Sequence, residues 1–483
     1  MNNIIGRENE INRLQLCMER GESQFVVVYG RRRVGKTFLI REFFHNEFTF
    51  NFTGIYNATK DIQLANFTTT LQQYWNRNFK IPGNWVEAFR LLREYLEEKK
   101  EKGKQRIVFI DELPWLDTQK SDLLTAIEIF WNHWAAWEGD IKFIVCGSAT
   151  SWITDKILNN TGGLYNRCTM RLFLNPFNLH ETELFLQKKG INWTRYDIAL
   201  CYMIMGGIPY YLNLLQPDLP LDRNIDELFF VKKAKLWDEH EQLYKTLFKN
   251  ANEYITVVEA LATKRMGLTR NEILAKTGLP NNGLISKVLD DLTYCDFIRK
   301  YNYYCNRKRD SLYQLSDFYS MFYYKFIKGS TGKDEHFWSN MANTPARYAW
   351  AGNAFEQLCK DHVQQIKKRI GISAVLSEYS SWFCRPDETY GPDDRGAQVD
   401  LVIDRMDKVI NLCEMKFSSG EYEIDKDYEM NLRNKIERFR TTTNTRKALH
   451  LTMVTTFGVK RNKYSGIVQS QVTIDDLFSI ADY

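Results

Sequence analysis

Residues with the types and spacing needed to hold phosphate lie near the start of the chain. Gly30, Gly35, Lys36 and Thr37 fit the pattern G-x-x-x-x-G-K-[ST], directly after the apolar run Phe25–Tyr29. The glycines let the loop wrap an oxyanion with backbone N–H groups, and a helix beginning at the lysine adds its positive end. Lys36 would bridge the β- and γ-phosphates of ATP, and Thr37 would ligate Mg²⁺. The alternative is a basic turn bounded by glycines. We predict that ATP contacts the phosphate loop: Gly30, Arg31, Arg32, Arg33, Val34, Gly35, Lys36 and Thr37.

A second chemical signal is a pair of acids that closes an apolar run. Ile107–Ile110 leads directly into Asp111 and Glu112, which predicts a buried parallel strand with both carboxylates at its C-terminal edge. Asp111 would hold Mg²⁺ through water, and Glu112 would orient and deprotonate the attacking water. The third apolar run, Phe143–Cys146, is followed by Ser148. Ser148 would contact the γ-phosphate, or it would only cap a turn.

Another set of charged residues lies in two largely apolar segments near the end of the sequence. Residues two apart on a strand share a face, so Glu414 and Lys416 should point the same way. Asp400 should meet them from the neighbouring strand, and Glu356 on the preceding helix would complete the site. Two carboxylates beside a lysine can bind Mg²⁺ and polarise water for phosphodiester attack. The alternative is that these acids are merely solvated, although charge in a buried strand is costly without a function.

The elements that position these groups belong to a large globular chain. Its 483 residues, 44% of them hydrophobic, predict about three domains of ~150 residues. Lysine and arginine total 65 against 60 acids, so any nucleic-acid surface must be local. The polar N-terminus does not resemble a signal peptide, and no apolar run approaches the ~20 residues that cross a bilayer. Nine scattered cysteines without a C-x-x-C pair indicate reduced thiols. We therefore predict a cytoplasmic protein without a membrane partner.

Several segments are predicted to be helical or to connect domains. Trp131, Trp134 and Trp137 recur at helical spacing and are expected to pack in a core. The pattern of residues 178–215 predicts helices with a kink at Gly206–Pro209. Residues 329–344 contain glycines and polar residues and are expected to form a linker.

Residues 252–327 have the pattern of a winged helix-turn-helix. Three helical segments precede two strand segments, and Thr269 with Glu272 predicts a capping box at the start of the second helix. The two strands and the turn between them form a wing that could contact double-stranded DNA phosphates. The alternative is a structural domain whose wing is only solvated. The residues of the predicted wing are Arg299, Lys300, Tyr301, Tyr303, Tyr304, Arg307, Lys308 and Arg309.

The first 250 residues resemble the archaeal-type ATPase family of the AAA+/STAND group of P-loop proteins. The last segment resembles the restriction-endonuclease-like domain of the PD-(D/E)XK class, whose motif matches Glu356, Asp400, Glu414 and Lys416. The stretches that carry the ATPase resemblance are Ile5–Glu8, Tyr29–Thr37, Ile110–Glu112, Gly147–Ser148, Leu164–Arg167, Pro176–Phe177 and Gly206–Pro209.

The resemblance implies further roles and a domain plan. Arg167 would be an arginine finger, acting on the γ-phosphate from a neighbouring subunit of a homo-oligomer, or a buried structural arginine. Asn166 stands where the family usually has glycine. Gly207 and Pro209 would lie near the adenine or ribose and sense the nucleotide state. The implied α/β fold has a P-loop ATPase core with a parallel sheet (1–177), a helical lid (178–250), a winged helix (251–328) and a nuclease-like α/β domain (345–483).

The predicted function follows from these sites. ATP hydrolysis with Mg²⁺ would switch a DNA-binding winged helix and a nuclease-like domain that cuts the bound DNA. The alternative is an ATP-dependent signalling switch whose C-terminal half only binds partners.

Overall fold

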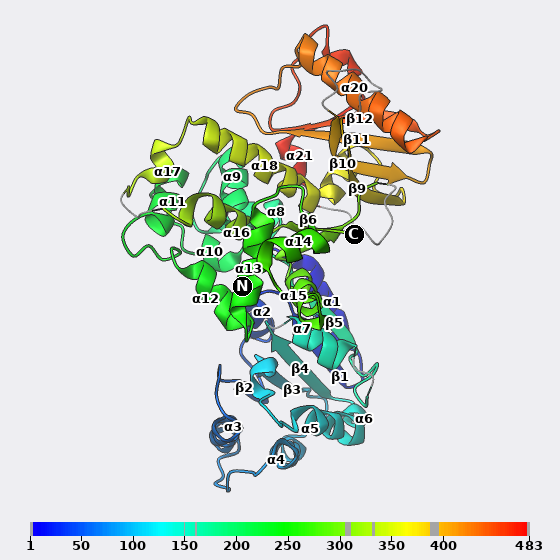
Figure 1. Cartoon of the computed structure of the whole chain (residues 1–483). Helices are drawn as coiled ribbons and strands as arrows, with labels where there is room; N and C mark the ends of the chain where they lie inside the picture. Colours follow the sequence, from blue (N-terminus) through cyan, green and yellow to red (C-terminus); the bar gives the residue numbers. More distant parts are fainter. Residues whose placement is uncertain are drawn as a thin grey trace. The chain divides into compact units, whose positions relative to one another are not determined.

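The computed structural model describes residues 3–148, 150–159, 162–304, 311–330, 334–386 and 396–480 (Figure 1). The chain divides into two compact units. The first unit comprises residues 1–176 and 246–249, and the second comprises residues 177–245 and 250–483. The phosphate loop belongs to the first unit, and the C-terminal carboxylates belong to the second.

A parallel five-stranded sheet forms the centre of the first unit (Figure 1). The strand order is β2-β3-β4-β1-β5, and every neighbouring pair is parallel. Because β4 lies between β1 and β3, the residues that follow these three strands meet at one edge of the sheet. The strands are β1 (Gln24–Tyr29), β2 (Phe50–Thr53), β3 (Arg106–Asp111), β4 (Ile141–Gly147) and β5 (Met170–Phe173).

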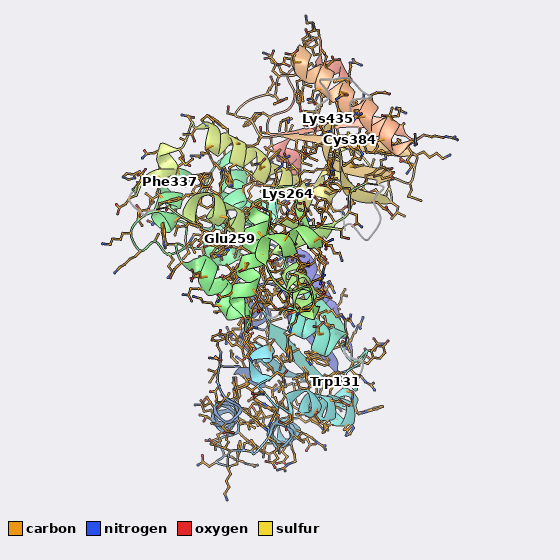
Figure 2. The ribbon with its side chains drawn as sticks, viewed as in Figure 1. Trp131, Glu259, Lys264, Phe337, Cys384 and Lys435 are labelled. Atoms are coloured by element: carbon orange, nitrogen blue, oxygen red, sulfur yellow. The ribbon has the colours of Figure 1, made fainter. Side chains whose placement is uncertain are left out.

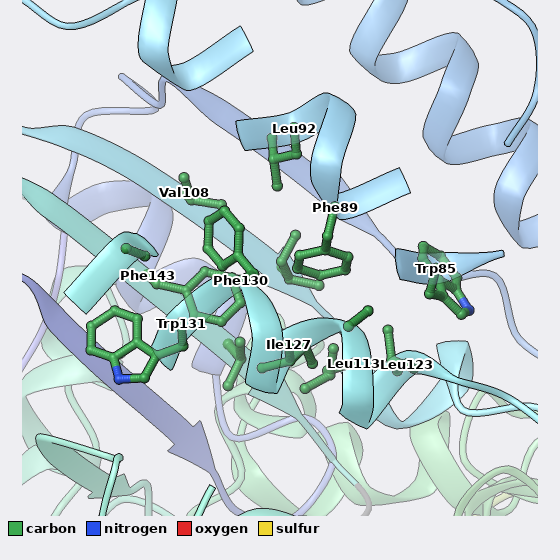
Figure 3. Packing of buried hydrophobic residues seen from close by; sticks show 14 of the residues in the cluster. Trp85, Phe89, Leu92, Val108, Leu113, Leu123, Ile127, Phe130, Trp131 and Phe143 are labelled. Atoms are coloured by element: carbon green, nitrogen blue, oxygen red, sulfur yellow. The ribbon is translucent and has the colours of Figure 1, made fainter. Parts of the chain in front are cut away.

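An aromatic core covers this sheet. Trp131, labelled in Figure 2, lies 5.3 Å from Phe25 between ring centroids, and Phe143 lies 5.1 Å from Phe25. Figure 3 shows how Phe89 and Phe130 pack beside them, with centroids 5.4 Å apart. Burying each such ring contributes about 1.5–3 kcal/mol. The helices of this unit are α1 (Glu8–Glu19), α2 (Lys36–Phe43), α3 (Lys60–Trp75), α4 (Trp85–Glu98), α5 (Leu123–Phe130), α6 (Ala136–Glu138) and α7 (Thr150–Ile153).

The prediction that three tryptophans share the core is wrong for Trp137. Trp131 and Trp134 are buried, but Trp137 is 83% exposed. Residues 131–135 form a π-helical turn. The wider turn changes the rotation per residue, so a spacing of three residues no longer keeps one face.

The helices after the first unit's sheet show the predicted kink. Gly206 and Gly207 have φ of 69° and 65°, a region that glycine enters without steric cost. A Cβ at Gly207 would lie 2.1 Å from the carbonyl oxygen of Phe177. Pro209 then starts the next helix. These helices are α8 (Leu179–Lys188), α9 (Arg195–Met205), α10 (Pro209–Leu212) and α11 (Leu221–Phe229), and α12 (Glu239–Leu247) follows along the chain.

Residues 251–315 form a three-helix element with a small antiparallel sheet in the order β6-β8-β7. The predicted capping box of Thr269 and Glu272 is confirmed. Residues 305–310, including the predicted wing-tip residues Arg307, Lys308 and Arg309, lie outside the described residues. The element contains α13 (Ala251–Ala262), β6 (Leu268–Thr269), α14 (Arg270–Thr277), α15 (Gly283–Tyr294), β7 (Ile298–Tyr301) and β8 (Leu312–Leu315).

The C-terminal sheet is mixed, with the order β13-β12-β11-β10-β9. Strand β10 pairs antiparallel with both β9 and β11, whereas β12 pairs parallel with both β11 and β13. The strands are β9 (Ser377–Cys384), β10 (Ala397–Arg405), β11 (Val409–Lys416), β12 (Ala448–Thr455) and β13 (Ser470–Val472). Helices α16 (Phe318–Phe322), α18 (Pro345–Asp361), α19 (Val363–Arg369), α20 (Lys426–Thr443) and α21 (Ile474–Leu477) complete the second unit.

The segment 329–344 is not a bare linker. It contains α17 (Phe337–Asn340), and Trp338 in this helix is fully buried. The backbone N–H of Trp338 donates to Asp226 on α11 at 2.8 Å, and the Arg347 guanidinium stacks 4.3 Å from the Trp338 ring. Helix α17 is therefore packed into the second unit, although the glycines and polar residues around it predicted only a linker.

Candidate functional site

The phosphate loop after β1 has the backbone shape of an anion-binding turn. Gly30, Arg33 and Gly35 have φ of 145°, 74° and 92°. A Cβ at Gly30 would lie 2.4 Å from the carbonyl oxygen of Leu174, so only glycine fits there. Successive amides in such loops point into one concavity, and α2 starts directly afterwards at Lys36. The sequence thus folds locally into a cradle of N–H donors beside a helix N-terminus.

The first two residues of α2 connect the loop to β3. Lys36 is buried, and its Nζ donates to the carbonyl oxygens of Gly30 at 2.9 Å and Arg31 at 2.8 Å. The hydroxyl of Thr37 donates to Oδ2 of Asp111 at 2.8 Å. A hydroxyl and a carboxylate this close can serve one Mg²⁺, directly or through water. The structure therefore brings together Lys36, Thr37 and Asp111 from motifs that lie far apart in the sequence.

The arginines of the loop add positive charge at the same place. Nη1 of Arg32 is buried and has no hydrogen-bond partner in the described part of the chain, and its guanidinium lies 5.9 Å from the Trp115 ring centroid. A buried donor without a partner is costly, and phosphate oxygens would satisfy it. Arg31 and Val34 are buried, so Val34 could offer only its backbone. These features fit a polyphosphate with a divalent cation.

Glu112 follows β3 in a left-handed conformation, with φ of 47°. Its carboxylate accepts hydrogen bonds from the hydroxyl of Ser148 at 2.9 Å and from the Ser148 backbone N–H at 3.2 Å. Burial raises the pKa of Glu112; the charge of Lys36 lowers it again, and that of Asp111 raises it. Ser148 follows β4, between the ends of β1 and β3. The sequence predicted that Ser148 contacts the γ-phosphate or caps a turn. The structure shows that Ser148 hydrogen-bonds to the carboxylate of Glu112.

Three further residues predicted for nucleotide handling belong to other segments of the chain. Arg167 is exposed in a turn, so the reading of it as a buried structural arginine is wrong. Asn166 before it has φ of 53°, a conformation that explains why glycine suits this position. Gly207 and Pro209 belong to the second unit, and their contact with the adenine or ribose stays a prediction.

The C-terminal sheet carries the acidic cluster, defined as Glu356, Asp400 and Glu414. Strands β10 and β11 pair antiparallel, and Leu401 is opposite Cys413. In the same register, the preceding residue of β10, Asp400, lies opposite the next residue of β11, Glu414. Side chains directly opposite each other on neighbouring strands lie on one face of the sheet. Asp400 and Glu414 are both buried. Two carboxylates thus meet on β10 and β11, as the alternation of the sequence predicted.

Glu414 is surrounded by donors. Its Oε1 lies 3.0 Å from Nζ of Lys416 and accepts from the Tyr428 hydroxyl at 2.9 Å. Its Oε2 accepts from Lys435 on α20 at 2.7 Å, and Lys435 is labelled in Figure 2. Burial works against ionisation, but Lys435 and Lys416 bring the pKa of Glu414 below its ordinary value. Lys416 therefore shares the face of Glu414, as predicted.

Glu356 on α18 contacts a cation from the three-helix element. Nη1 of Arg265 donates to Oε1 of Glu356 at 2.9 Å and to the side-chain oxygen of Asn353 at 2.7 Å. Burial and the charge of Asp400 raise the pKa of Glu356 to about 7. Burial and the charge of Glu414 likewise raise the pKa of Asp400. The surroundings therefore favour the protonated forms of Glu356 and Asp400 and the ionised form of Glu414.

The residues that the structure describes do not form a three-carboxylate metal site. Within the described ranges, no group of three or more His, Cys, Asp or Glu side chains is arranged to hold a metal ion. Glu356, predicted to complete the site, is paired with Arg265 instead. Asp400 and Glu414 remain as a pair of oxygen ligands, which suits Mg²⁺ because this ion keeps several waters.

A comparison with known protein families finds a match for the N-terminal part of the chain. Residues 4–215 match the model of a family described as an ATPase domain predominantly from Archaea. This region is therefore similar to ATPase domains found predominantly in Archaea. The match covers the phosphate loop, Asp111, Glu112, Ser148 and the glycine kink.

Relatives of the whole chain are distant. An uncharacterized protein of Methanocaldococcus jannaschii is 24% identical over 418 residues, which are 86% of this chain and 87% of that protein. An uncharacterized ATP-binding protein of the same archaeon is 28% identical over 181 residues, 34% of this chain and 48% of that protein. The solved Walker-type ATPase PABY2304 of Pyrococcus abyssi is 16% identical, with a TM-score of 0.49, and the match covers 67% of this chain and 96% of that chain. In the part of the chain that the structure describes, no helix is long and apolar enough to cross a membrane.

Sequence reasoning found Asp111 and Glu112 of the first unit but missed the partners of the acidic cluster. Lys360 lies four residues after Glu356, so helical spacing could have placed both on one face of α18. Lys435, Tyr428 and Arg265 come from other elements. No local pattern connects them to Glu356 or Glu414.

Proposed function

We propose that the ATPase domain binds ATP with Mg²⁺ in the phosphate loop and hydrolyses it. The observation that carries this proposal is the 2.8 Å hydrogen bond between Thr37 and Asp111, which joins the predicted magnesium ligands of two distant motifs. In this proposal Lys36 and Arg32 hold the β- and γ-phosphates, and Thr37 and Asp111 hold Mg²⁺. When bound, Mg²⁺ neutralises charge on the phosphates.

Glu112 is the proposed general base. It lies at the end of β3 beside Asp111, and burial raises its pKa above the ordinary value, which makes the carboxylate a stronger proton acceptor. Ser148 holds the carboxylate through its hydroxyl and its backbone N–H, so a γ-phosphate that attracts the Ser148 hydroxyl would free Glu112 for water. Arg167, exposed in its turn, is proposed to act on the γ-phosphate of a neighbouring subunit in a homo-oligomer.

The experiment compares two variants with the wild-type chain. Lys36→Ala should abolish tight ATP binding in calorimetry, because it removes the cation that is expected to bridge the β- and γ-phosphates. Glu112→Gln should bind ATP normally but hydrolyse it roughly 10²–10⁴-fold more slowly in a single turnover. Lys80→Ala changes an exposed lysine of the same unit and should behave as wild type. Near-normal ATP affinity in Lys36→Ala, or a wild-type turnover rate in Glu112→Gln, would contradict these assignments.

The proposed domain plan follows the sequence reading: an ATPase core at 1–177, a helical lid at 178–250, a winged helix at 251–328 and a nuclease-like domain at 345–483. Support for the winged helix comes from three helices followed by the β7–β8 hairpin. Support for the nuclease-like domain comes from Asp400 opposite Glu414, with Lys416 on the same face. ATP hydrolysis would switch these C-terminal parts, which would bind and cut double-stranded DNA.

A second candidate is a C-terminal half that binds partners without cutting. The contacts of Glu414 favour it, because Lys416, Lys435 and Tyr428 already occupy both carboxylate oxygens. The predicted wing residues are also engaged within the second unit: Arg299 pairs with Asp361, and the Tyr304 hydroxyl donates to Asp404 at 3.1 Å. The two candidates differ in whether Asp400 and Glu414 bind a divalent cation.

A further inference from the structure

A cavity of about 790 Å³ lies within the second unit, where the three-helix element meets the C-terminal sheet. Its walls come from residues 299–304, from the end of α18 and the start of α19, and from β9 and β10. Cavities that bind small molecules commonly have volumes of about 300–1,000 Å³. The phosphate loop belongs to the first unit, so this cavity is a separate place where a small molecule could bind.

The walls of this cavity are held together by aromatic packing. The ring of Tyr303 packs on that of Phe383 with centroids 4.5 Å apart, and the ring of Tyr304 packs on Phe439 with centroids 5.0 Å apart. Phe439 belongs to the apolar core of the C-terminal sheet. The backbone N–H of Tyr304 also donates to the carbonyl oxygen of Ser381 at 2.9 Å. The cavity is therefore preformed, and a ligand would bind without reorganising its walls.

Two neighbouring cations line the cavity. Lys360 and Arg299 both contribute to the lining, and Arg299 pairs with Asp361. Burial and the charge of Arg299 hold the pKa of Lys360 below its ordinary value, although Asp400 and Glu356 act in the opposite direction. Lys360 makes no hydrogen bond or ion pair with any residue that the structure describes. A phosphate group would supply oxygens that accept from both the ammonium and the guanidinium.

Aromatic side chains form another part of the lining. Tyr303 is bridged to Ser381 of β9, and side chains two residues apart on a strand share a face. Tyr379 and Phe383 therefore flank Ser381 on the face of β9 that Tyr303 covers. Tyr303 and Tyr379 line the cavity, and Tyr379 is 42% exposed. A nucleobase stacks favourably on an exposed aromatic ring of this kind.

The remaining polar groups of the lining suit a nucleoside. The side-chain oxygen of Asn302 accepts from the Ser311 hydroxyl at 2.8 Å, so its amide nitrogen can donate to a ligand. Glu378 is exposed and can accept from ribose hydroxyls, as carboxylates do in other nucleotide sites. Glu378 shares the lining with Asp361 and Asp404. These three carboxylates would repel the successive phosphates of a nucleic-acid strand, whereas a single phosphate can lie beside the cations.

We propose that this cavity binds a free mononucleotide. Its phosphate lies between Lys360 and Arg299, its base stacks on Tyr379, and its ribose hydroxyls donate to Glu378. The second unit thus has a nucleotide site of its own, in addition to the proposed ATP site of the first unit. This site requires neither a metal ion nor cleavage of DNA.

Calorimetry on the full-length chain tests the proposal. The parent carries Lys36→Ala, which is intended to remove nucleotide binding at the phosphate loop, and it is titrated with AMP, GMP, CMP and UMP in turn. At least one of the four should bind. Lys360→Met should weaken that binding about tenfold, because a charge-assisted contact with the phosphate is lost. Tyr379→Leu should weaken it by about tenfold as well, because the stacking ring is lost.

Two matched variants control for general effects of these substitutions. Lys276→Met removes an exposed lysine of α14, and Tyr348→Leu removes a tyrosine of α18 that is 51% exposed. Neither residue lines the cavity, so both variants should bind the mononucleotide as the parent does. Circular dichroism and thermal melting verify that each variant is folded. If Lys360→Met does not fold, the exposed position of Tyr379 still provides the test.

Three results would overturn the proposal. The first is that none of the four mononucleotides binds to the parent. The second is that binding is unchanged in Lys360→Met or in Tyr379→Leu. The third is that a single-stranded tetranucleotide binds more tightly than every mononucleotide and loses this binding in Lys360→Met, since the cavity would then hold part of a strand.

Discussion

Glu112 and Glu356 are partly buried carboxylates that lie in different electrostatic surroundings. Glu112 accepts two hydrogen bonds from Ser148 and lies near Lys36. Glu356 has Asp400 as its strongest charged neighbour, and Arg265 offsets only part of the repulsion. Its pKa of about 7 means that the folded chain keeps a proton on Glu356 at pH values where the unfolded chain has lost it.

This difference predicts a dependence of stability on pH. The folded pKa of Glu356 is raised from 4.5 to about 7, so its contribution is fully present below pH 4.5 and is lost as pH rises through 7. Glu356→Gln should remove this slope, which amounts to up to ~3 kcal/mol. Thermal unfolding midpoints from pH 4.5 to 7.5 measure it. Glu335→Gln, at an exposed position, is the control. Parallel pH profiles for wild type and Glu356→Gln would contradict the assignment.

Sequence patterns predicted an element correctly where all the residues that define it lie in one short segment. The phosphate loop and the acids after β3 could be predicted from the sequence because each of them follows a continuous apolar strand. The capping box at Thr269 was readable because both partners lie within one turn. Trp137 was misplaced because a π-helical turn changes the period, and Arg265 was missed because its partners lie far away along the chain. Contacts between distant elements depend on tertiary packing, which no local period encodes.

The predicted wing of the three-helix element leads to an expectation about how DNA affinity depends on salt concentration. Replacing Arg307, Lys308 and Arg309 with alanine should weaken DNA binding and flatten its salt dependence by roughly one slope unit per lost contact. Fluorescence anisotropy with a labelled duplex at several salt concentrations measures both. Lys287→Ala, on the exposed face of α15, tests separately whether this helix contacts DNA. If the wild-type chain shows no salt-sensitive DNA binding, the element is structural.

For the whole molecule, two chemical sites in separate units should be separable by mutation. Asp400→Ala should abolish Mg²⁺-dependent DNA cleavage and leave the rate of ATP hydrolysis unchanged, because Asp400 is in the second unit and the phosphate loop is in the first. Nuclease and ATPase assays on the same preparation measure both. Asp407→Ala, an exposed acid in the turn after β10, is the control. Cleavage that survives Asp400→Ala would support the C-terminal half as a binding module.

The buried Trp338 restricts how this chain can be divided. Its indole packs 5.1 Å from the Phe322 ring and 5.4 Å from the Trp350 ring, and its backbone is tied to Asp226 on α11. A gene fragment that begins after residue 344 would leave α11 with an apolar hole and strip Trp350 of its neighbour. The C-terminal domain is therefore not an independent folding unit, and the helices at 178–245 and the domain after residue 345 need to be expressed together.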